Sequence, residues 1–262
     1  IAIDHEHQGG SLFNTLMSAL MNDVHRAGYA ACYVYTKASA RDAFAWLGFR
    51  EIAHVEDKLY FLENALHGLP QYLAALRGKY VAGSRIAAIV MNANPFTNGH
   101  RYLVEKAARE NDVVHLFVLS EDLSHYPGSV RLALVKAGIA PLKNVYVHPT
   151  GDYIISAATF PSYFLREDDD VTTIQARLDA RIFKEHIAPA LGITKRYVGH
   201  EPYSAATAIY NQALQQEFAG APQLEIVERL RADGEYISAS RVRELIANGN
   251  LEAVRPLVPP TT

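Results

Sequence analysis

The stretch over residues 85–101 constrains the fold of this chain more than any other segment. It begins with six consecutive apolar residues, Ile86–Met91, which is the length of a buried β-strand. Asparagine, proline and glycine then break the pattern, and His100 opens a segment with helical periodicity. A buried strand that runs through a tight turn into a helix directs free backbone N–H groups at one point, where the helix dipole favours negative charge. The stretch therefore predicts an anion-binding turn, although an ordinary turn with an early helical histidine would show the same pattern.

From residue 85 onward, apolar strands alternate with helical segments, which predicts a Rossmann-like α/β domain with a doubly wound parallel sheet. The expected strands cover residues 86–91, 113–119, 144–148, 196–199 and 223–226. The expected helices cover residues 100–110, 130–138, 172–187, 205–217 and 240–248. Ligands of such sheets bind beyond the carboxyl ends of the strands, so the turns at those ends are where we look for a site.

The composition is that of an ordinary globular protein of 262 residues, with 49% hydrophobic and 20% charged residues. This length suits two modest domains or one large one. The formal net charge of −3 gives no electrostatic reason to expect nucleic acid or an anionic membrane as a partner. We find no apolar run of bilayer length and no signal-like segment, and we expect a cytoplasmic protein. The single cysteine, Cys32, excludes an intramolecular disulfide and is expected to pack in a buried strand.

Residues 1–64 predict a smaller α+β unit. In order, we expect a helix from Ser11 to Gly28, a strand over 30–35, a short helix capped by Ser39, and strands over 51–55 and 58–62. A helical segment over 69–76 and a linker over 79–84 follow, so we place a connector at 65–84 and the second domain at 85–262.

The order of these first elements resembles the C-terminal two-thirds of a GNAT-type acyltransferase domain. The resemblance depends on the Gly-rich turn at 8–11 and on the later Leu47-Gly48-Phe49. In that family the turn holds the pyrophosphate of acyl-CoA through backbone N–H groups. Ser11 and Phe13 stand where the family prefers glycine and a small residue, and Phe13 would crowd the pyrophosphate. We therefore expect a partial GNAT-like scaffold domain more than a CoA site.

Four polar segments fall at expected carboxyl ends of strands, namely residues 94–100, 120–124, 199–202 and 236–243. The last is the most informative. Ser238 and Ser240 stand at a helix N-terminus, where hydroxyl and free N–H groups can hold phosphate oxygens. Arg243 lies three residues after Ser240 on the same helical face, so its guanidinium can bind the same anion. An ordinary serine cap followed by an exposed arginine is the alternative.

The turn T-N-G-H at 97–100 and the segment I-S-A-S-R-V-R at 237–243 together resemble the paired signatures of the nucleotidyltransferase superfamily. Those Rossmann-like enzymes direct attack at the α-phosphate of ATP and release pyrophosphate. His100 matches the second histidine of the first signature. Thr97 stands where many members have the first histidine, so it can donate a hydroxyl hydrogen bond but cannot supply a cation.

Longer blocks narrow the resemblance to the citrate lyase ligases. The blocks are I-V-M-N-A-N-P-F-T-N-G-H-R-Y-L-V-E, V-H-L-F-V-L-S-E-D, Y-I-I-S-A-A-T-F-P-S-Y-F-L and R-Y-V-G-H-E-P. The resemblance runs from residue 85 to the last residues, and the GNAT-like first part is also that family's arrangement. It implies an ATP-dependent ligase that activates acetate as acetyl-adenylate. The acetyl group then passes to the thiol of the phosphoribosyl-dephospho-CoA group on the acyl carrier subunit of citrate lyase.

The resemblance also assigns residues. It makes His100 and Thr97 catalytic, with His100 bonding the α- and β-phosphates and stabilising charge on the leaving pyrophosphate. The residues expected to bind ATP are Asn94, Phe96, Gly99, Gly199, Glu201, Ser238, Ser240 and Arg243. We expect no protein metal ligands, because no carboxylate cluster is evident, and expect Mg²⁺ to be held mainly by ATP and water.

Two further expectations concern side chains around this site. Tyr153, Ser156, Phe160 and Tyr163 are expected to wall the acetate and pantetheine pocket, with core packing as the alternative. Arg131 is expected to be an exposed surface residue, with a contact to nucleotide or carrier as the alternative.

Three other functions remain open from the sequence. The first is an adenylyltransferase that acts on a phosphorylated small molecule and needs a more cationic acceptor pocket. The second is an acyl-CoA-dependent acetyltransferase that works through residues 1–64. The third is a non-catalytic nucleotide-binding or carrier-docking protein. Acetate-dependent exchange of pyrophosphate into ATP separates the expected ligase from all three.

Overall fold

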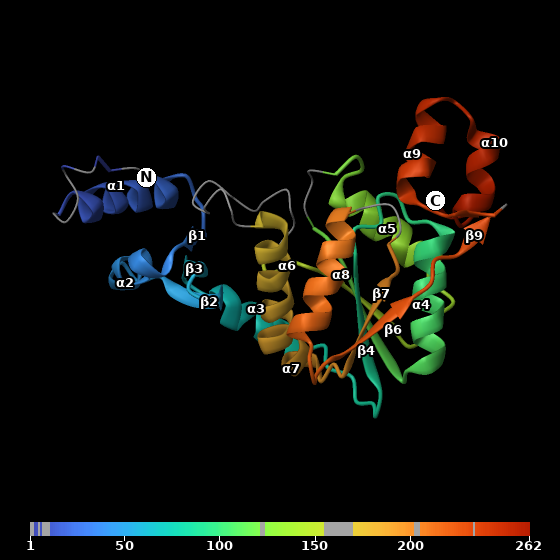
Figure 1. Ribbon diagram of the computed structural model, residues 1–262, viewed down its shortest axis with the longest axis horizontal. Coiled ribbons are helices and arrows are strands. Elements are labelled where there is room, and N and C mark those ends of the chain that lie inside the picture. The colour runs from blue at the N-terminus through green and yellow to red at the C-terminus, as the bar shows by residue number, and fades with distance from the viewer. Residues whose placement is uncertain are drawn as a thin grey trace.

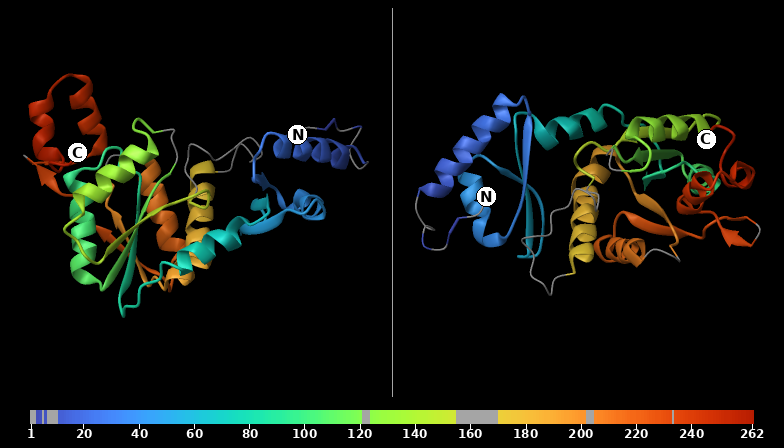
Figure 2. Two further views of the ribbon diagram at one scale, coloured as in Figure 1. Left: turned by 180° about the vertical axis from the view of Figure 1, so that it is seen from behind. Right: turned by 90° about the horizontal axis from the view of Figure 1, so that it is seen from above.

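Two sheets of different kinds organise the chain in the computed structural model, which describes residues 3–4, 6, 11–120, 124–154, 170–201, 205–232 and 234–262. One is a three-stranded antiparallel sheet near the N-terminus, and the other is a five-stranded parallel sheet (Figure 1). The N-terminal unit and the helices of the C-terminal end lie at opposite ends of the molecule (Figures 1 and 2).

The N-terminal unit consists of two helices and the antiparallel sheet, whose strand order is β1-β3-β2. Its elements are α1 (Leu12–Arg26), β1 (Ala31–Thr36), α2 (Ala38–Trp46), β2 (Arg50–Val55) and β3 (Leu59–Ala65). The expected elements are confirmed, but the expected cap of α2 is wrong. Lys37 has the extended backbone of an N-cap, and Ser39 already lies inside the helix. Cys32 is half-buried in β1.

The connector helix α3 (Gly68–Arg77) leads into the parallel sheet, whose order is β6-β5-β4-β7-β8. The first half contains β4 (Ile86–Met91), α4 (Asn98–Glu110), β5 (Val113–Val118), α5 (Gly128–Gly138) and β6 (Val145–Pro149). The second half contains α6 (Val171–Ile182), the π-helical turn η2 (Phe183–Ile187), α7 (Ala188–Leu191), β7 (Lys195–Gly199), α8 (Ala205–Glu217) and β8 (Gln223–Val227). All four strand pairings are parallel, which confirms the Rossmann-like sheet.

Strand β4 explains why this sheet has two cores. Its side chains alternate between the two faces of the sheet, and nearly all of them are buried. Ile86 and Ala88 belong to a core shared with α6, η2 and α7, whereas Ala87 and Ile89 belong to a core shared with α4 and α5. The helices accordingly cover both faces of the sheet (Figures 1 and 2). The continuous apolar run of β4 is thus the consequence of burial on both faces.

The antiparallel sheet packs against α6 and shares a core with the parallel sheet. Val55, Leu59 and Phe61 are at most 1% exposed and belong to the same apolar cluster as α6 and β4. Polar contacts cross the same boundary: the Arg181 guanidinium donates to the His54 carbonyl at 3.0 Å. Tyr153 lies at this boundary as well, where its hydroxyl donates to Glu63 at 2.8 Å.

The C-terminal segment returns to the carboxyl ends of the strands. It contains β9 (Arg231–Ala232), β10 (Glu235–Tyr236), α9 (Ala239–Ala247), α10 (Leu251–Val254) and the short turn η3 (Arg255–Leu257). The Asn98 side-chain amide donates to the Pro256 carbonyl at 3.0 Å, which ties this segment to the start of α4. No helix among the residues that the structure describes has both the length and the apolar character that crossing a membrane requires.

Candidate functional site

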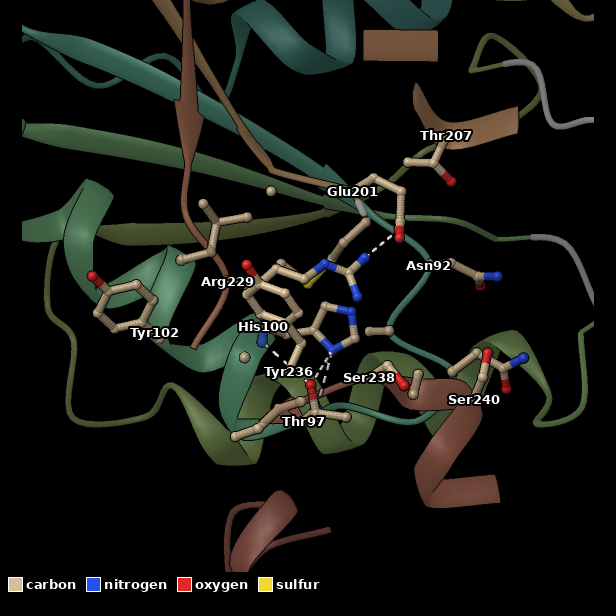
Figure 3. Close-up of a pocket in the computed structure, with 18 of the residues that line it drawn as sticks. Asn92, Thr97, His100, Tyr102, Glu201, Thr207, Arg229, Tyr236, Ser238 and Ser240 are labelled. Atoms are coloured by element: carbon tan, nitrogen blue, oxygen red, sulfur yellow. Dashed lines mark hydrogen bonds and ion pairs between the residues drawn. The ribbon is translucent and has the colours of Figure 1, made fainter. Parts of the chain in front are cut away.

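A cavity of about 1020 Å³ opens at the carboxyl ends of β4, β7 and β8. The N-termini of α4 and α9 both face it, with His100 between them (Figure 3). The predicted site residues that line it are Asn94, Thr97, Gly99, His100, Gly199, Glu201, Ser238, Ser240 and Arg243. This volume is at the upper end of the range for small-molecule sites.

Thr97 and His100 form a reciprocal cap at the start of α4. The Thr97 hydroxyl oxygen accepts from the His100 backbone N–H at 3.3 Å, and His100 Nδ1 accepts from the Thr97 backbone N–H at 3.1 Å. The hydroxyl oxygen also lies 3.0 Å from Nδ1. Two free N–H groups of the helix start are satisfied in this way. Because Nδ1 accepts a hydrogen bond, the neutral ring carries its proton on Nε2.

The environment of His100 keeps its ring uncharged. Burial lowers the pKa of His100 to about 4, and the nearby Arg229 cation acts in the same direction. Phe96 lies parallel to the imidazole, with ring centroids 5.9 Å apart and planes 13° apart, and is itself fully buried. His100 is therefore a fixed, neutral hydrogen-bond donor at neutral pH.

Arg229 supplies positive charge next to this neutral ring, although no sequence motif marks it. Its Nε donates to the His200 carbonyl at 2.7 Å, and its Nη2 forms an ion pair with Glu201 (Figure 3). Glu201, which the sequence predicts as an ATP contact, lines the cavity and forms an ion pair with this arginine. The position of Arg229, two residues after β8, was the available signal, because ligands bind beyond the carboxyl ends of such strands.

The N-terminus of α9 is tied directly to the turn at Asn94. Ser238 caps the helix, accepting from the Arg241 N–H at 3.2 Å. Arg243 donates through Nη2 to the Ser240 hydroxyl at 3.1 Å and through Nη1 to the Asn94 carbonyl at 2.5 Å. The structure therefore brings together the two segments that the sequence paired, although 149 positions separate Asn94 from Arg243.

Phe96 and Arg131 support the site from behind its wall. Phe96 lies under the imidazole of His100 and does not line the cavity. The expectation of an exposed Arg131 is wrong: this residue is fully buried. Its guanidinium donates to the carbonyl oxygens of Asn92, at 2.8 Å, and Tyr126, at 3.0 Å. An arginine can be buried where a turn offers several carbonyl oxygens, because its guanidinium has five N–H donors that these oxygens can accept from. The residue type alone therefore does not predict exposure.

Several other predicted segments lie away from the cavity or outside the described residues. Tyr153 is 5% exposed, sits in the core between the two sheets and does not line the cavity. Ser156, Phe160 and Tyr163, the other expected walls of an acetate pocket, lie outside the described residues, as do 121–123 and Pro202. Ser124, at the end of the second polar segment, exchanges hydrogen bonds with the Asn92 side chain at 3.1 and 3.2 Å.

The parallel sheet and the two helix N-termini at one cavity define an α/β protein with a candidate anion-binding site. The family description "Citrate lyase ligase C-terminal domain" matches residues 86–262. The citrate (pro-3S)-lyase ligase of Escherichia coli K12 is 41% identical over 268 residues, which cover 100% of this chain and 76% of that protein. The enzyme of the same name from Klebsiella pneumoniae is 42% identical, covering 100% of this chain and 78% of that protein. The chain belongs to the citrate lyase ligase family.

More distant likenesses appear among solved structures. A pantothenate synthetase from Thermus thermophilus is 18% identical, with a TM-score of 0.43 over 70% of this chain and 78% of that one. The pantoate-beta-alanine ligase of Francisella tularensis is 16% identical, with a TM-score of 0.43 over 71% of this chain and 77% of that one. Likenesses at this level carry no functional inference.

Proposed function

We propose that the chain activates acetate with ATP as acetyl-adenylate and acetylates the thiol of the phosphoribosyl-dephospho-CoA group on the acyl carrier subunit of citrate lyase. Membership of the citrate lyase ligase family supports the substrates. The observation that carries the ATP-dependent step is the convergence of the α4 and α9 N-termini, with His100 between them, on one cavity.

The first step is attack by an acetate oxygen on the α-phosphorus of ATP. An O–P bond forms to acetate, the bond from the α-phosphorus to the bridging oxygen breaks, and pyrophosphate leaves with that oxygen. Acetate is already anionic at neutral pH, so no base has to activate it. Positioning of the two anions and stabilisation of the charge on the leaving group must supply most of the rate enhancement.

The residues of the cavity suit that task. In the proposal, the Nε2–H of His100 donates to an oxygen of the α- or β-phosphate, and Arg229 supplies the cation that Thr97 cannot. The N-terminus of α9, with Ser240 and Arg243, holds the β- and γ-phosphates. Thr97 acts through His100, because its hydroxyl and N–H both face the ring.

Mg²⁺ would enter with ATP and neutralise charge on the phosphates. Glu201, which lines the cavity, is paired with Arg229, and Glu235 is paired with Arg241. These two carboxylates are engaged with arginines. In the proposal, phosphate oxygens and water are the main ligands of the ion. In the second step the carrier thiolate attacks the acetyl carbonyl, a C–S bond forms, and AMP leaves as the C–O bond breaks.

The test is exchange of labelled pyrophosphate into ATP, with and without acetate, in the chain and in His100→Ala. We expect exchange to require acetate and to fall by about 100-fold or more in the variant, because loss of one preorganised donor to a charged transition state costs ~2.7–4 kcal/mol.

His67→Ala is the matched control, because His67 is an exposed histidine at the start of α3 and does not line the cavity. Circular dichroism checks that both variants fold. Exchange at the parental rate in folded His100→Ala would contradict the role of the ring, and exchange that ignores acetate would contradict the substrate. Transfer of labelled acetyl to the reduced carrier subunit tests the second step.

A further inference from the structure

A buried charged cluster lies behind the wall of the cavity, formed by Asp179 on α6, Arg196 on β7 and Tyr210 on α8. Asp179 and Arg196 are each 1% exposed, and Tyr210 is one of the residues that line the cavity. Charged side chains are rarely buried to this degree, because removing them from water is costly unless partners compensate. We therefore ask what this cluster does that apolar side chains in the same place would not do.

The Tyr210 hydroxyl is the centre of the cluster. It donates to an Asp179 carboxylate oxygen and accepts from Arg196 Nη2 at 2.7 Å. The carboxylate and guanidinium themselves are 3.9 Å apart, so the hydroxyl bridges them. The guanidinium also lies 4.4 Å from the ring centroid of Phe183. Two polar contacts to opposite charges therefore fix the position of the Tyr210 ring along α8.

The cavity end that Tyr210 lines is distinct from the end at α9. Gly199, Thr207 and Asn211 line the cavity from β7 and α8, and the Asn211 amide donates to the Gly199 carbonyl at 3.1 Å. Figure 3 shows Thr207 and Glu201 on one side of the His100 ring and Ser238 and Ser240 on the other. If α9 holds the β- and γ-phosphates, the adenosine must extend toward β7 and α8.

We propose that Tyr210 forms part of the adenosine-binding wall and that Asp179 and Arg196 are positioning residues that hold its ring in place. The inference rests on the proposed function and specifies which residues determine nucleoside binding. An aromatic ring beside a nucleoside provides apolar contact and stacking, and small displacements of such a wall weaken binding without touching the phosphates.

The test compares the binding of ATP and of inorganic tripolyphosphate by calorimetry in the full chain and its variants. Tyr210→Phe keeps the ring and removes both hydrogen bonds, and Asp179→Asn keeps the shape and removes the charge. We expect each variant to bind ATP ~10-fold more weakly and tripolyphosphate unchanged. Arg243→Ala should weaken both ligands, because it acts at the phosphate end.

Glu56→Gln is the matched control. Glu56 forms an ion pair at 2.8 Å with Arg177, which is also on α6, but neither residue lines the cavity. Thermal unfolding shows whether a variant is merely destabilised. The double variant Tyr210→Phe, Asp179→Asn should bind ATP as weakly as each single variant does, because both substitutions break the same hydrogen bond between Tyr210 and Asp179.

The outcomes separate the two proposals. A parental chain that binds no ATP would overturn the adenylating function and the inference with it. A parental chain that binds ATP, with variants that bind it equally well despite a lower melting temperature, would overturn the inference alone by showing a purely structural cluster. Equal weakening of ATP and tripolyphosphate would also overturn it, because the cluster would then act on the whole cavity.

Discussion

Thr97 stands where the sequence resemblance leads us to expect a histidine, and its contacts indicate a role in orienting His100. Its side chain is 1% exposed, and its hydroxyl oxygen lies within 3.3 Å of both the N–H and Nδ1 of His100. Its backbone N–H donates to Nδ1 at 3.1 Å, which leaves the proton of the neutral ring on Nε2. Charge next to the ring comes instead from Arg229, at the end of a distant strand.

The Thr97→Val variant tests this view at the level of one hydroxyl. Loss of the cap should lower the free energy of unfolding by about 1 kcal/mol. It should also lower acetate-dependent pyrophosphate exchange, because the ring loses its contact with the hydroxyl and is held less firmly. Thr97→Ser keeps the hydroxyl and should retain most of both properties. If Val and Ser variants exchange pyrophosphate equally well, the hydroxyl does not orient His100.

Helix α5 supports His100 through Phe96. The last residue of α5, Gly138, packs so closely against Phe96 that an added Cβ would lie 2.5 Å from Cε1 of that ring. Real Cβ atoms do not approach other heavy atoms this closely, so a side chain at this position must displace the phenyl ring. The phenyl ring in turn lies parallel to the imidazole. The geometry of the site thus depends on an element that contributes no residue to the cavity wall.

Gly138→Ala should therefore act as an overpacking variant. We expect it to lower the free energy of unfolding by about 1–3 kcal/mol and to reduce pyrophosphate exchange more than that loss explains. Urea unfolding and exchange at a temperature where the variant is folded measure the two effects. Gly78→Ala is the control, because its added Cβ would find its nearest neighbour at 3.5 Å. If Gly138→Ala exchanges pyrophosphate at the parental rate, α5 does not support the position of His100.

At the scale of the whole molecule, burial keeps three histidines of the described part of the chain in their neutral form. His115 Nδ1 lies 2.9 Å from His148 Nε2 on neighbouring strands, and burial lowers the pKa of each to about 4. His100 has its pKa lowered to about 4 in the same way. The ordinary value for all three is 6.5. Between pH 6.5 and 4 the unfolded chain therefore binds protons that the folded chain excludes.

The free energy of unfolding should accordingly fall as the pH drops from 6.5 toward 4, and these groups should leave it unchanged above that window. Each proton contributes a slope of at most about 1.4 kcal/mol per pH unit. Urea unfolding from pH 4 to 7.5 measures the profile, and His100→Gln should make it shallower. A profile that is flat between pH 4 and 6.5 would show that the folded chain accepts these protons.

The shared core between the two sheets predicts that they unfold together. Phe61 is 1% exposed and stacks on Tyr35 with ring centroids 4.6 Å apart, within the core that α6 and β4 also enter. Phe61→Ala should lower the free energy of unfolding by about 3–5 kcal/mol. In this variant, hydrogen exchange should show an equal loss of protection for the slowest-exchanging amides of β3 and of β4. Leu66→Ala, at an 84% exposed position, should change neither. Protection lost in β3 alone would show that the N-terminal unit unfolds independently.

Local pattern was enough to predict most helices and strands and the two helix starts that line the cavity. The run Ile86–Met91 has the length of a strand and no polar side to turn to water, which predicted a buried strand, and the structure confirms it. The turn at His100 and the segment with Ser238, Ser240 and Arg243 were paired through a resemblance to known family signatures, and the structure places both at one cavity. Ser39, placed one residue inside α2, shows that the ends of short helices are less well defined by sequence.

The sequence by itself determined a parallel α/β domain and the tight turn that leads from β4 into α4 at His100, since these depend on periodicity and on residues close together in the chain. Only the tertiary structure decided which groups surround that histidine. Burial and the Arg229 cation keep the imidazole neutral, and the Thr97 N–H sets its tautomer. Arg131 lies buried against carbonyl oxygens, which the sequence did not predict. The reason is physical: pKa values and hydrogen-bond partners depend on distance and desolvation between segments that only folding brings together.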